Sequence, residues 1–459
     1  MLVSLVALLI TLSLGASQAR ATQITGFADE NVGTWSAPTW TAFNNTGVKQ
    51  VRHIVAWNVA YNPGDLATLH AWVNTAQAHG LSVLISFNHN GATPPGVTDY
   101  RNAIIKFREE FPGISEYTAW NEPNHHPSSA PNSNPADLPS LAAAYWFELD
   151  RQCHLPKYGP NCTVAAGDFL DSNDVGNFAE YIDQYKAKLA SYGVSPSVWA
   201  IHPYGAVASG NWNALNATFL PRTENKPIWF TEVGAMVCKA GSGLVAPNFP
   251  AAEASQNVDA GRLLSLINYV GGRVHRTYYY FLSATNGTQA PCPGFDSGLL
   301  GANETIRPAF LTLFPNAVLP PFASTSGVSA LSNSQATIDV AVDPRGYHSY
   351  YRLDWGPTSG YGNQSPNEYA GFQPGGAGHS VTLSGLSPGA TYHYRVVAFS
   401  SMGATYGPDQ VVQTKAPPVV TTQGAGNVEY TKAHPSASIN PMGAATTYHF
   451  DYGMTAGYG

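Results

Sequence analysis

Eight short apolar segments, separated by longer amphipathic stretches, fill the first two thirds of this chain and restrict its fold more than any other feature. The apolar segments have the length of strands, and they are residues 24–27, 50–57, 82–88, 116–120, 163–167, 198–202, 228–231 and 277–282. Intervening stretches such as residues 65–79 and 177–191 have the pattern of helices. Strands that alternate with helices are typical of a parallel sheet.

The number of these units decides between the two common folds with a parallel sheet. Eight strand–helix units in about 290 residues match a (β/α)8 TIM barrel, which usually has about 250 residues. A doubly wound sheet would show a glycine-rich phosphate turn after its first strand, and none follows residues 24–27. We therefore predict an α/β fold with a TIM barrel over residues 22–315.

The composition changes after Pro315, where alternating Val, Thr, Tyr and Ser replace the helical pattern. The proline pair at 320–321 marks a linker and recurs at 417–418. Residues 350–356 recur at 447–453 with the same offset of 97 residues. A period of about 100 residues indicates tandem β domains rather than a solenoid.

The first copy contains Leu-Ser-Pro-Gly-Ala-Thr-Tyr at residues 386–392. This segment resembles the E–F corner of fibronectin type III domains, in which a tyrosine hydroxyl bonds back to the backbone. We expect a fibronectin type III-like sandwich over residues 316–415. The second copy reaches Gly459 before its own version of the corner, so residues 416–459 are expected to form a partial second domain.

The N-terminus has the pattern of an export signal. Residues 2–14 are apolar, and Ala-Arg-Ala at 19–21 matches a cleavage site, although no Lys or Arg precedes the apolar run. We predict a signal peptide over residues 1–21 and a secreted protein. No later segment has about 18 consecutive apolar residues, so no membrane span is expected.

Export makes disulfides possible, and the four cysteines allow three pairings. We favour Cys153–Cys162, which closes a short local loop, and Cys238–Cys292, which would join two loops at one end of the barrel. A metal site is the alternative use of cysteines. Neither a C-x-x-C pair nor a spaced histidine cluster supports one, so no metal is predicted.

Charge and aromatic content indicate the kind of partner. Charged residues make up 11% of the chain, against about 25% in ordinary soluble proteins, and the formal charge is −7. Because Lys and Arg total only 22, nucleic acid is a poor candidate. The 12% aromatic content suits a carbohydrate partner, since flat rings pack against the C–H faces of sugars, although the same rings can be core residues. We expect a monomer that binds a poly- or oligosaccharide.

Two glutamates stand where barrel strands are predicted to end. Glu122 lies in Ala-Trp-Asn-Glu-Pro-Asn after the fourth strand, and Glu232 lies in Trp-Phe-Thr-Glu-Val-Gly after the seventh. TIM-barrel active sites lie at the carboxyl ends of the strands. Hydrolysis of a glycosidic bond needs one carboxyl group as proton donor and another that attacks or supports the anomeric carbon. A single such glutamate is more often a cap or surface charge, but two in this strand order are harder to explain that way.

Both segments resemble the signatures of clan A glycoside hydrolases, the retaining superfamily that includes families 5 and 39. The resemblance covers about residues 23–313. It implies that Glu122 is the general acid/base, that Glu232 is the nucleophile, and that Asn121 hydrogen-bonds the sugar 2-hydroxyl. No organic cofactor or metal is needed for this chemistry. The acid should keep its proton near the working pH, while the nucleophile should stay ionised.

Other polar residues near the strand ends are expected to complete the site. Arg52 on the second strand matches an arginine that the family places near the nucleophile, where it would keep Glu232 charged; a surface arginine is the alternative. His202 and Tyr204 occur in His-Pro-Tyr after the sixth strand, which also resembles clan members. We assign both to positioning Glu232 and binding sugar hydroxyls, with a purely structural histidine as the alternative.

Two further predicted substrate contacts rest on weaker signals. His89 follows the third strand. The eighth strand reads Tyr-Tyr-Tyr-Phe at 278–281 and lacks the tryptophan that clan members often carry there. A tyrosine could stack in its place; which one depends on the phase of the strand, and Tyr280 is our candidate. The sequence therefore predicts a secreted retaining O-glycosidase acting on a β-linked saccharide. A non-catalytic carbohydrate-binding or adhesion protein is the alternative, and a transglycosylase would use the same residues.

Overall fold

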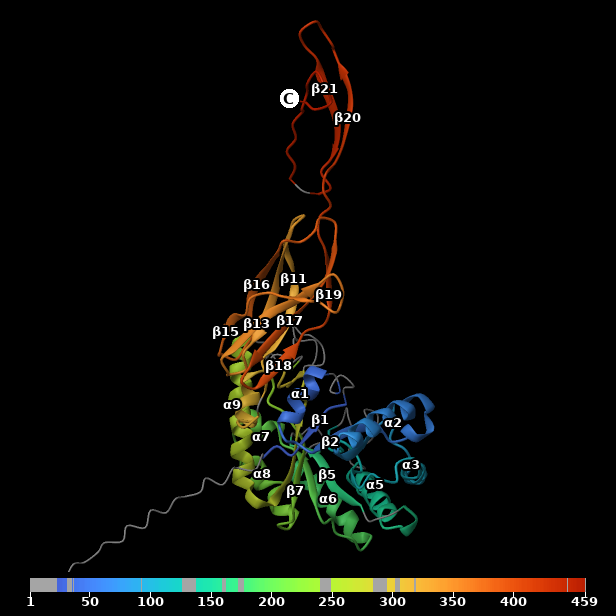
Figure 1. Cartoon of the computed structure of the whole chain (residues 1–459). Helices are drawn as coiled ribbons and strands as arrows, with labels where there is room; N and C mark the ends of the chain where they lie inside the picture. The colour runs from blue at the N-terminus through green and yellow to red at the C-terminus, as the bar shows by residue number, and fades with distance from the viewer. Residues whose placement is uncertain are drawn as a thin grey trace, which may run out of the picture. The chain divides into compact units, whose positions relative to one another are not determined.

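The computed structural model describes residues 23–458, except 31–34, 36, 92, 126–137, 159–161, 172–176, 240–248, 284–294, 302–305, 318 and 444. The predicted signal peptide lies outside the described residues. The chain forms two compact units, whose elements are labelled in Figure 1. The first comprises Met1–Glu30, Gly47–Ala235 and Val258–Tyr280, and the second comprises Asn31–Thr46, Met236–Asn257 and Phe281–Gly459.

The first unit contains a closed barrel of eight parallel strands, which confirms the predicted TIM barrel. In barrel order the strands are β1 (Gly26–Ala28), β2 (Gln50–Ala56), β3 (Ser82–Asn88), β4 (Glu116–Thr118), β5 (Thr163–Leu170), β6 (Trp199–His202), β7 (Ile228–Val233) and β9 (Val274–Tyr280). Strand β9 pairs with β1 and closes the ring. Each strand overlaps one of the eight predicted segments, and β5 runs three residues further than its predicted end at Gly167.

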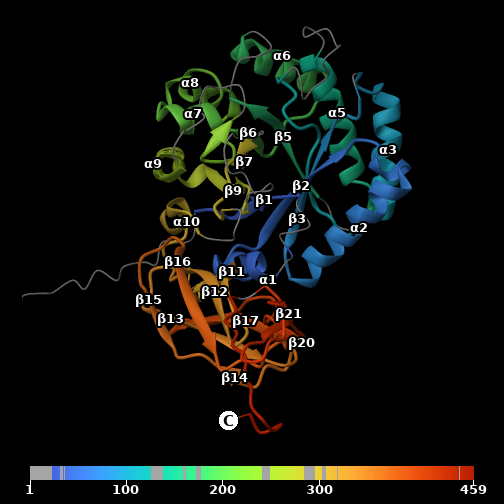
Figure 2. The ribbon, with the colours of Figure 1, turned by 90° about the horizontal axis from the view of Figure 1, so that it is seen from above.

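Helices lie outside the ring of strands, as Figure 2 shows for the first unit. They are α2 (Pro63–Ala78), α3 (Val97–Glu110), α5 (Leu138–Cys153), α6 (Phe178–Ser191), α7 (Tyr204–Ser209) and α8 (Asn213–Ala217), and α9 (Phe249–Val270) continues into this unit. Two begin with an asparagine cap: Asn62 accepts from the amide of Gly64, and Asn177 from that of Ala179. Short 3-10 turns cover Val59–Tyr61, Pro156–Tyr158, Leu220–Thr223 and Gly271–Arg273. Among the described residues, no helix combines the length and apolarity that crossing a membrane requires.

The inside of the barrel holds an apolar layer and a polar one. The apolar layer consists of Ala28, Leu84, Ala165, Val198, Ala200, Trp229 and Tyr278. Residues two apart on a strand share a face, so Ser86 lies on the same inner face as Leu84, and His202 on the same face as Ala200. These side chains bring the polar layer to the carboxyl ends of the strands, where TIM-barrel sites lie.

The second unit contains a β-sandwich, as the alternating sequence after Pro315 predicts. One sheet is β11 (Phe322–Leu331), β12 (Gln335–Asp343) and β16 (Ala377–Ser384). The other contains β13 (Ser349–Gly356), β14 (Asn363–Gln364), β15 (Glu368–Gly371), β17 (Thr391–Ser400), β18 (Gly403–Tyr406) and β19 (Gln410–Gln413). The hydroxyl of Tyr392 accepts a hydrogen bond from the amide of Ser387 at 2.9 Å, which is the backbone contact predicted for the corner.

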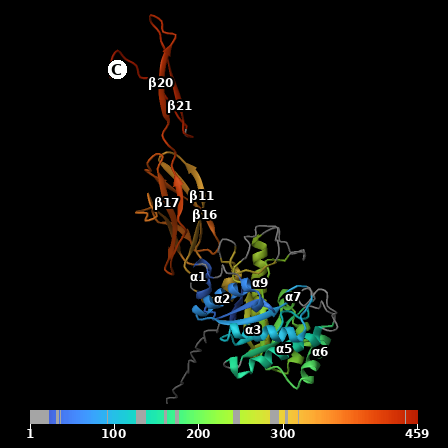
Figure 3. The ribbon, with the colours of Figure 1, turned by 90° about the vertical axis from the view of Figure 1, so that its right-hand side faces the viewer.

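Smaller elements complete the second unit. They are α1 (Ala37–Asn45), α10 (Pro308–Leu313), the antiparallel pair β8 (Cys238–Lys239) and β10 (Phe295–Asp296), and the antiparallel pair β20 (Val419–Gly426) and β21 (His434–Asn440). Figure 3 shows β20 and β21 side by side, and every residue of β20 is exposed. The hairpin of β20 and β21 lies within residues 416–459, the second copy of the sequence repeat.

One of the two predicted disulfides lies within the described chain. Cys153, the last residue of α5, is bonded to Cys162, just before β5, which confirms the local pairing. Cys292 lies outside the described residues, so its pairing with Cys238 stays a prediction.

Candidate active site

A buried carboxylate, Asp168, occupies the centre of the polar layer. It follows Gly167 at a break in the register between β5 and β6, where both residues have positive φ values of 97° and 61°. Such a bulge adds one residue to the strand and redirects the next side chain. The redirected carboxylate is completely buried and contacts five side chains: Arg52, Ser86, Thr118, His202 and Thr231.

Arg52 on β2 connects this centre to the predicted catalytic residues. Its guanidinium donates to Asp168 at 3.0 Å, to Glu232 at 2.7 Å and to the Asn121 side-chain oxygen at 2.7 Å. Its Nε donates to Ser86 at 2.8 Å. A completely buried guanidinium needs such partners, because an unpaired charge in the interior is very unfavourable. Arg52 is therefore an interior residue rather than the surface arginine that the sequence left open.

Glu232 on β7 is held by two donors. Oε2 accepts from Arg52 at 2.7 Å, and Oε1 accepts from the Tyr204 hydroxyl at 3.0 Å. The register of β7 against β9 shifts between Phe230 and Val233, at the position of this carboxylate. Donors on both of its oxygens hold the carboxylate in one orientation.

Glu122 lies in the segment after β4 and adopts an unusual backbone conformation. Its φ is +46°, a left-handed value that costs a residue with a side chain about 1–3 kcal/mol. The amide of Glu122 donates to the carbonyl of Asp168 at 2.9 Å, and the side chain of Asn124 bonds both backbone groups of Leu170. These contacts tie the segment to β5 and fix the direction of the Glu122 carboxyl group.

His202 on β6 connects Glu122 to Asp168. Its Nδ1 lies 2.9 Å from Glu122 and its Nε2 lies 3.1 Å from Asp168. Burial lowers the pKa of His202, but the charges of Asp168 and Glu232 outweigh this and raise it to about 10. Burial raises the pKa of Glu122, but the hydrogen bond and charge of His202 outweigh that effect and lower it. At neutral pH His202 is therefore an imidazolium between two carboxylates.

The two predicted catalytic carboxylates lie close together. One ligand atom each of Glu122, His202 and Glu232 lies within 4.8 Å of the others. This spacing would also suit a metal ion if His202 gave up a proton, since an imidazolium has no lone pair for a metal. The chemistry of the cluster is that of two acids and an imidazolium.

Of the remaining predicted site residues, some join this network of polar side chains and others do not. His202 hydrogen-bonds Glu122 and Asp168, and a carboxylate oxygen of Glu232 lies within 4.8 Å of one of its ring nitrogens. Tyr280 ends β9, and burial and the charge of Glu232 raise its pKa. His89 follows β3, and its side chain takes no part in the network that the structure describes.

Sequence reasoning missed Asp168, together with Ser86, Thr118 and Thr231. Strict alternation along β5 would turn Asp168 toward the outer helices, and only the bulge brings it inside. The available signal was a lone acid within the apolar segment Thr-Val-Ala-Ala-Gly-Asp-Phe-Leu of residues 163–170.

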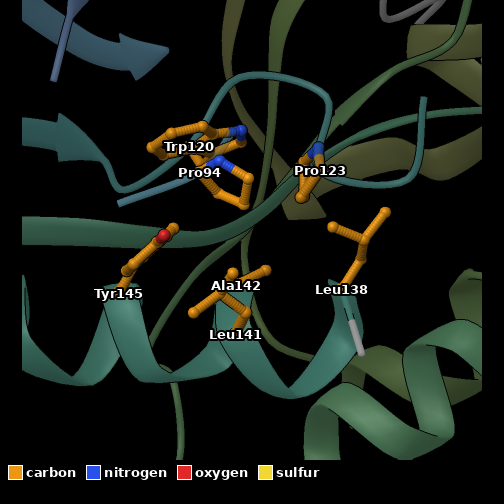
Figure 4. A pocket seen from close by; sticks show the side chains of 7 residues that line it. All are labelled: Pro94, Trp120, Pro123, Leu138, Leu141, Ala142 and Tyr145. Atoms are coloured by element: carbon orange, nitrogen blue, oxygen red, sulfur yellow. The ribbon is translucent and has the colours of Figure 1, made fainter. Parts of the chain in front are cut away.

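A small apolar hollow lies beside the segment that carries Glu122 (Figure 4). Trp120 and Pro123 face helix α5 across it, and its full lining is Pro94, Trp120, Pro123, Leu138, Leu141, Ala142 and Tyr145. No lining residue is charged, and the Tyr145 hydroxyl already donates to the carbonyl of Pro95. We interpret it as packing between α5 and the catalytic segment.

Comparisons with known proteins found solved structures of low sequence identity. No protein-family model matches the sequence, and neither does any curated protein. A GH128 endo-β-1,3-glucanase from Amycolatopsis mediterranei, solved with laminaripentaose, is 17% identical over 63% of this chain and 98% of its own, with a TM-score of 0.37. A fungal β-1,4-galactanase is 14% identical over 64% of this chain and 99% of its own, with a TM-score of 0.48.

A third similar structure is shorter. The sensor domain of the anti-sigma factor RsgI4 in Pseudobacteroides cellulosolvens is 20% identical over 22% of this chain and 98% of its own, with a TM-score of 0.18. At these identities the function of this chain has to be inferred from its own residues.

Proposed function

We propose that this chain is a glycoside hydrolase that cleaves β-linked poly- or oligosaccharides with retention of configuration. The observation that carries the proposal is the pair Glu122 and Glu232, which follow β4 and end β7 with carboxylate oxygens within 4.8 Å of each other. Retaining enzymes place their carboxyl groups about 5–5.5 Å apart, whereas inverting enzymes leave about 6.5–9.5 Å for a water molecule.

Glu232 acts as the nucleophile. Hydrogen bonds from Arg52 and Tyr204 hold its carboxylate in one orientation. Attack of one oxygen on the anomeric carbon forms a glycosyl–enzyme bond as the bond to the leaving oxygen breaks. Pre-positioning of this kind lowers the barrier because no side chain has to reorganise.

Glu122 and His202 supply and recover the proton as a unit. Glu122 was expected to hold its own proton, but its pKa is lowered and the proton rests on His202 at neutral pH. The His202 side chain is completely buried and that of Glu122 is 12% exposed, so the proton reaches the leaving oxygen through Glu122. In the second step the pair takes a proton from the water that opens the intermediate.

Asn121 binds the sugar beside Glu232. Its side-chain oxygen accepts from Arg52, so the amide nitrogen is directed elsewhere and is available as a donor. A donor at this place suits a hydrogen bond to the 2-hydroxyl, which strengthens in the transition state.

We also propose that the protein is secreted and that its fibronectin type III-like domains act as spacers. The N-terminal pattern of residues 1–21 and the Tyr392 corner contact support it. A polysaccharide outside the cell would be an accessible substrate for a monomeric enzyme of this kind.

Hydrolysis of soluble polysaccharides tests the proposal. Laminarin, β-1,4-galactan and carboxymethyl-cellulose are incubated with wild type, Glu122→Gln and Glu232→Gln, and reducing ends are counted. We expect activity from wild type, a loss of about 10²–10⁴-fold for Glu122→Gln, and a larger loss for Glu232→Gln. NMR of the first product should show the β-anomer.

Three results separate the alternatives. An α-anomeric first product would exclude the retaining mechanism. Transfer of glycosyl groups to an added sugar in preference to water would indicate a transglycosylase. A wild type that binds glycans but hydrolyses none of the panel would support the non-catalytic carbohydrate-binding alternative.

A further inference from the structure

A third acidic side chain, Glu30, lies beside the catalytic pair. Residue Ala28 of β1 pairs with Arg52 of β2 on one side and with Tyr280 of β9 on the other. After β1 ends at Ala28, the chain continues beside β2, since the amide of Asp29 donates to the carbonyl of Arg52. Glu30 follows two residues after Ala28, so it shares the inner face and lies one step nearer the carboxyl ends of the strands.

The carboxyl group of Glu30 is anchored but remains partly exposed. Its Oε1 accepts from the amide of Ile54 at 3.2 Å. The charges of Arg52, Glu232 and Asp29 act on this carboxyl group, and its own charge acts on the Tyr280 phenol. The group is therefore built into the wall of the site where the sugar attacked by Glu232 would bind.

The protonation of Glu30 follows from these neighbours. Burial and then the negative charge of Glu232 raise its pKa to about 7, against the opposing charge of Arg52. Below this pH the group is a neutral acid with one O–H to donate. Above it, a second anion stands beside Glu232 and the donor is lost.

We propose that Glu30 is a substrate-binding residue whose carboxyl group donates a hydrogen bond to a hydroxyl of the sugar unit bound against Glu232. The inference rests on the proposed function, and it adds a specificity contact to the catalytic pair. A sugar hydroxyl is the ligand that suits this place, because it accepts from a neutral acid and carries no charge that Glu232 would repel. Ionisation of Glu30 weakens binding, so activity should decline above about pH 7.

Kinetics as a function of pH test the contact. On whichever panel polysaccharide wild type hydrolyses fastest, kcat/KM is measured from pH 5 to 9 for wild type, Glu30→Gln, Glu30→Ala and Glu109→Gln. Glutamine keeps a donor at every pH, so Glu30→Gln should stay within about threefold of wild type at pH 6 and move the alkaline decline up by at least one pH unit. Glu30→Ala should lose roughly tenfold in kcat/KM at pH 6, mainly through KM.

Glu109→Gln is the matched control, because Glu109 is an exposed glutamate of α3 that pairs only loosely with Lys157 at 3.8 Å. It should reproduce the wild-type profile. Thermal unfolding of each variant at pH 6 identifies any that fold poorly, and the isosteric Glu30→Gln should fold. An unchanged alkaline limb in Glu30→Gln, or an unchanged KM in folded Glu30→Ala, would overturn the inference.

A second measurement separates this inference from the proposed function. If wild type hydrolyses nothing, the proposed function fails, and binding of laminarihexaose is measured by calorimetry at pH 6 and 8. Weaker binding at pH 8 for wild type but not for Glu30→Gln would still support the contact. Absence of binding by wild type at both pH values would overturn it.

Discussion

The polar layer inside the barrel and the hydrophobic cluster of the sandwich differ in the side chains that they bury. At the carboxyl ends of the barrel strands, Arg52, Asp168 and His202 are completely buried and joined by hydrogen bonds. The hydrophobic cluster between the sandwich sheets includes Ile338, Leu353 and Val396, and the buried polar residues of this domain, such as Asp343 and Asp354, lie outside that cluster. Each apolar side chain that is fully buried stabilises the fold by about 1.5–3 kcal/mol. A buried ionic network is weak evidence for stability, because desolvation offsets the attraction.

This difference indicates that the buried polar network of the barrel serves the catalytic residues rather than stability. A domain that only has to stay folded can rely mainly on a cluster of apolar side chains such as that of the sandwich. The barrel instead keeps a group of charges that fixes Glu122 through His202 and Glu232 through Arg52. Removing one member should leave the others buried without partners, whereas removing a sandwich side chain should leave only a cavity.

The largest expected effect is a loss of barrel stability at alkaline pH. The pKa of His202 is raised to about 10 in the folded chain from 6.5, so its contribution is complete below pH 6.5 and is lost as pH rises through 10. The full contribution is up to about 5 kcal/mol. Denaturant unfolding from pH 6 to 10, followed by tryptophan fluorescence, reports mainly on residues before 230, which include nine of the ten tryptophans. A His202→Gln variant should lack the decline, and an equal decline in both proteins would contradict the assignment.

Asp168→Ala should have the next largest effect. It leaves the charges of Arg52 and His202 buried with fewer partners, which should destabilise the barrel by about 3–5 kcal/mol. Denaturant midpoints at pH 7 measure the change. Asp183→Ala serves as the comparison, because Asp183 pairs with Arg222 on the surface and should cost less than about 1 kcal/mol. Equal losses in the two variants would show that the central carboxylate has no special role.

Leu353→Ala should destabilise the sandwich by about 3 kcal/mol through the cavity it leaves. Leu353 is completely buried in the sandwich core. Calorimetry should show a lower transition for the sandwich, while hydrolysis by the barrel stays at the wild-type rate. The exposed Val411 on β19 provides the control, since Val411→Ala should change stability by less than about 0.5 kcal/mol. Loss of hydrolysis in Leu353→Ala below its transition would contradict the separation of the two roles.

The smallest effects come from deleting one hydroxyl in each region. Tyr204→Phe removes a donor to Glu232 and should lower kcat by roughly tenfold with little change in stability. Tyr392→Phe removes the corner bond to Ser387 and should cost the sandwich about 1 kcal/mol without changing kcat. Both kcat and thermal unfolding are measured for each variant. If the two variants changed kcat and stability in the same way, the barrel network and the sandwich corner would not differ in role.

The sequence alone predicted the barrel, because the period of its apolar segments is a local property. The strand ends were readable within a few residues, and so were Glu122 and Glu232, since an acid directly after a strand lies at the mouth in any TIM barrel. The corner bond of Tyr392 and the short disulfide Cys153–Cys162 were also local, each spanning fewer than ten residues.

Only the tertiary structure decided which side chains meet. A bulge after Gly167 turned Asp168 inward against the alternation of β5, and the closed barrel placed His202 between Glu122 and Asp168. Glu30 acquires its neighbours from β2, β7 and β9, which no pattern within its own segment encodes. The physical reason is that side-chain period is set residue by residue, whereas register, bulges and the proton affinities that follow from them depend on strands that are distant in the chain.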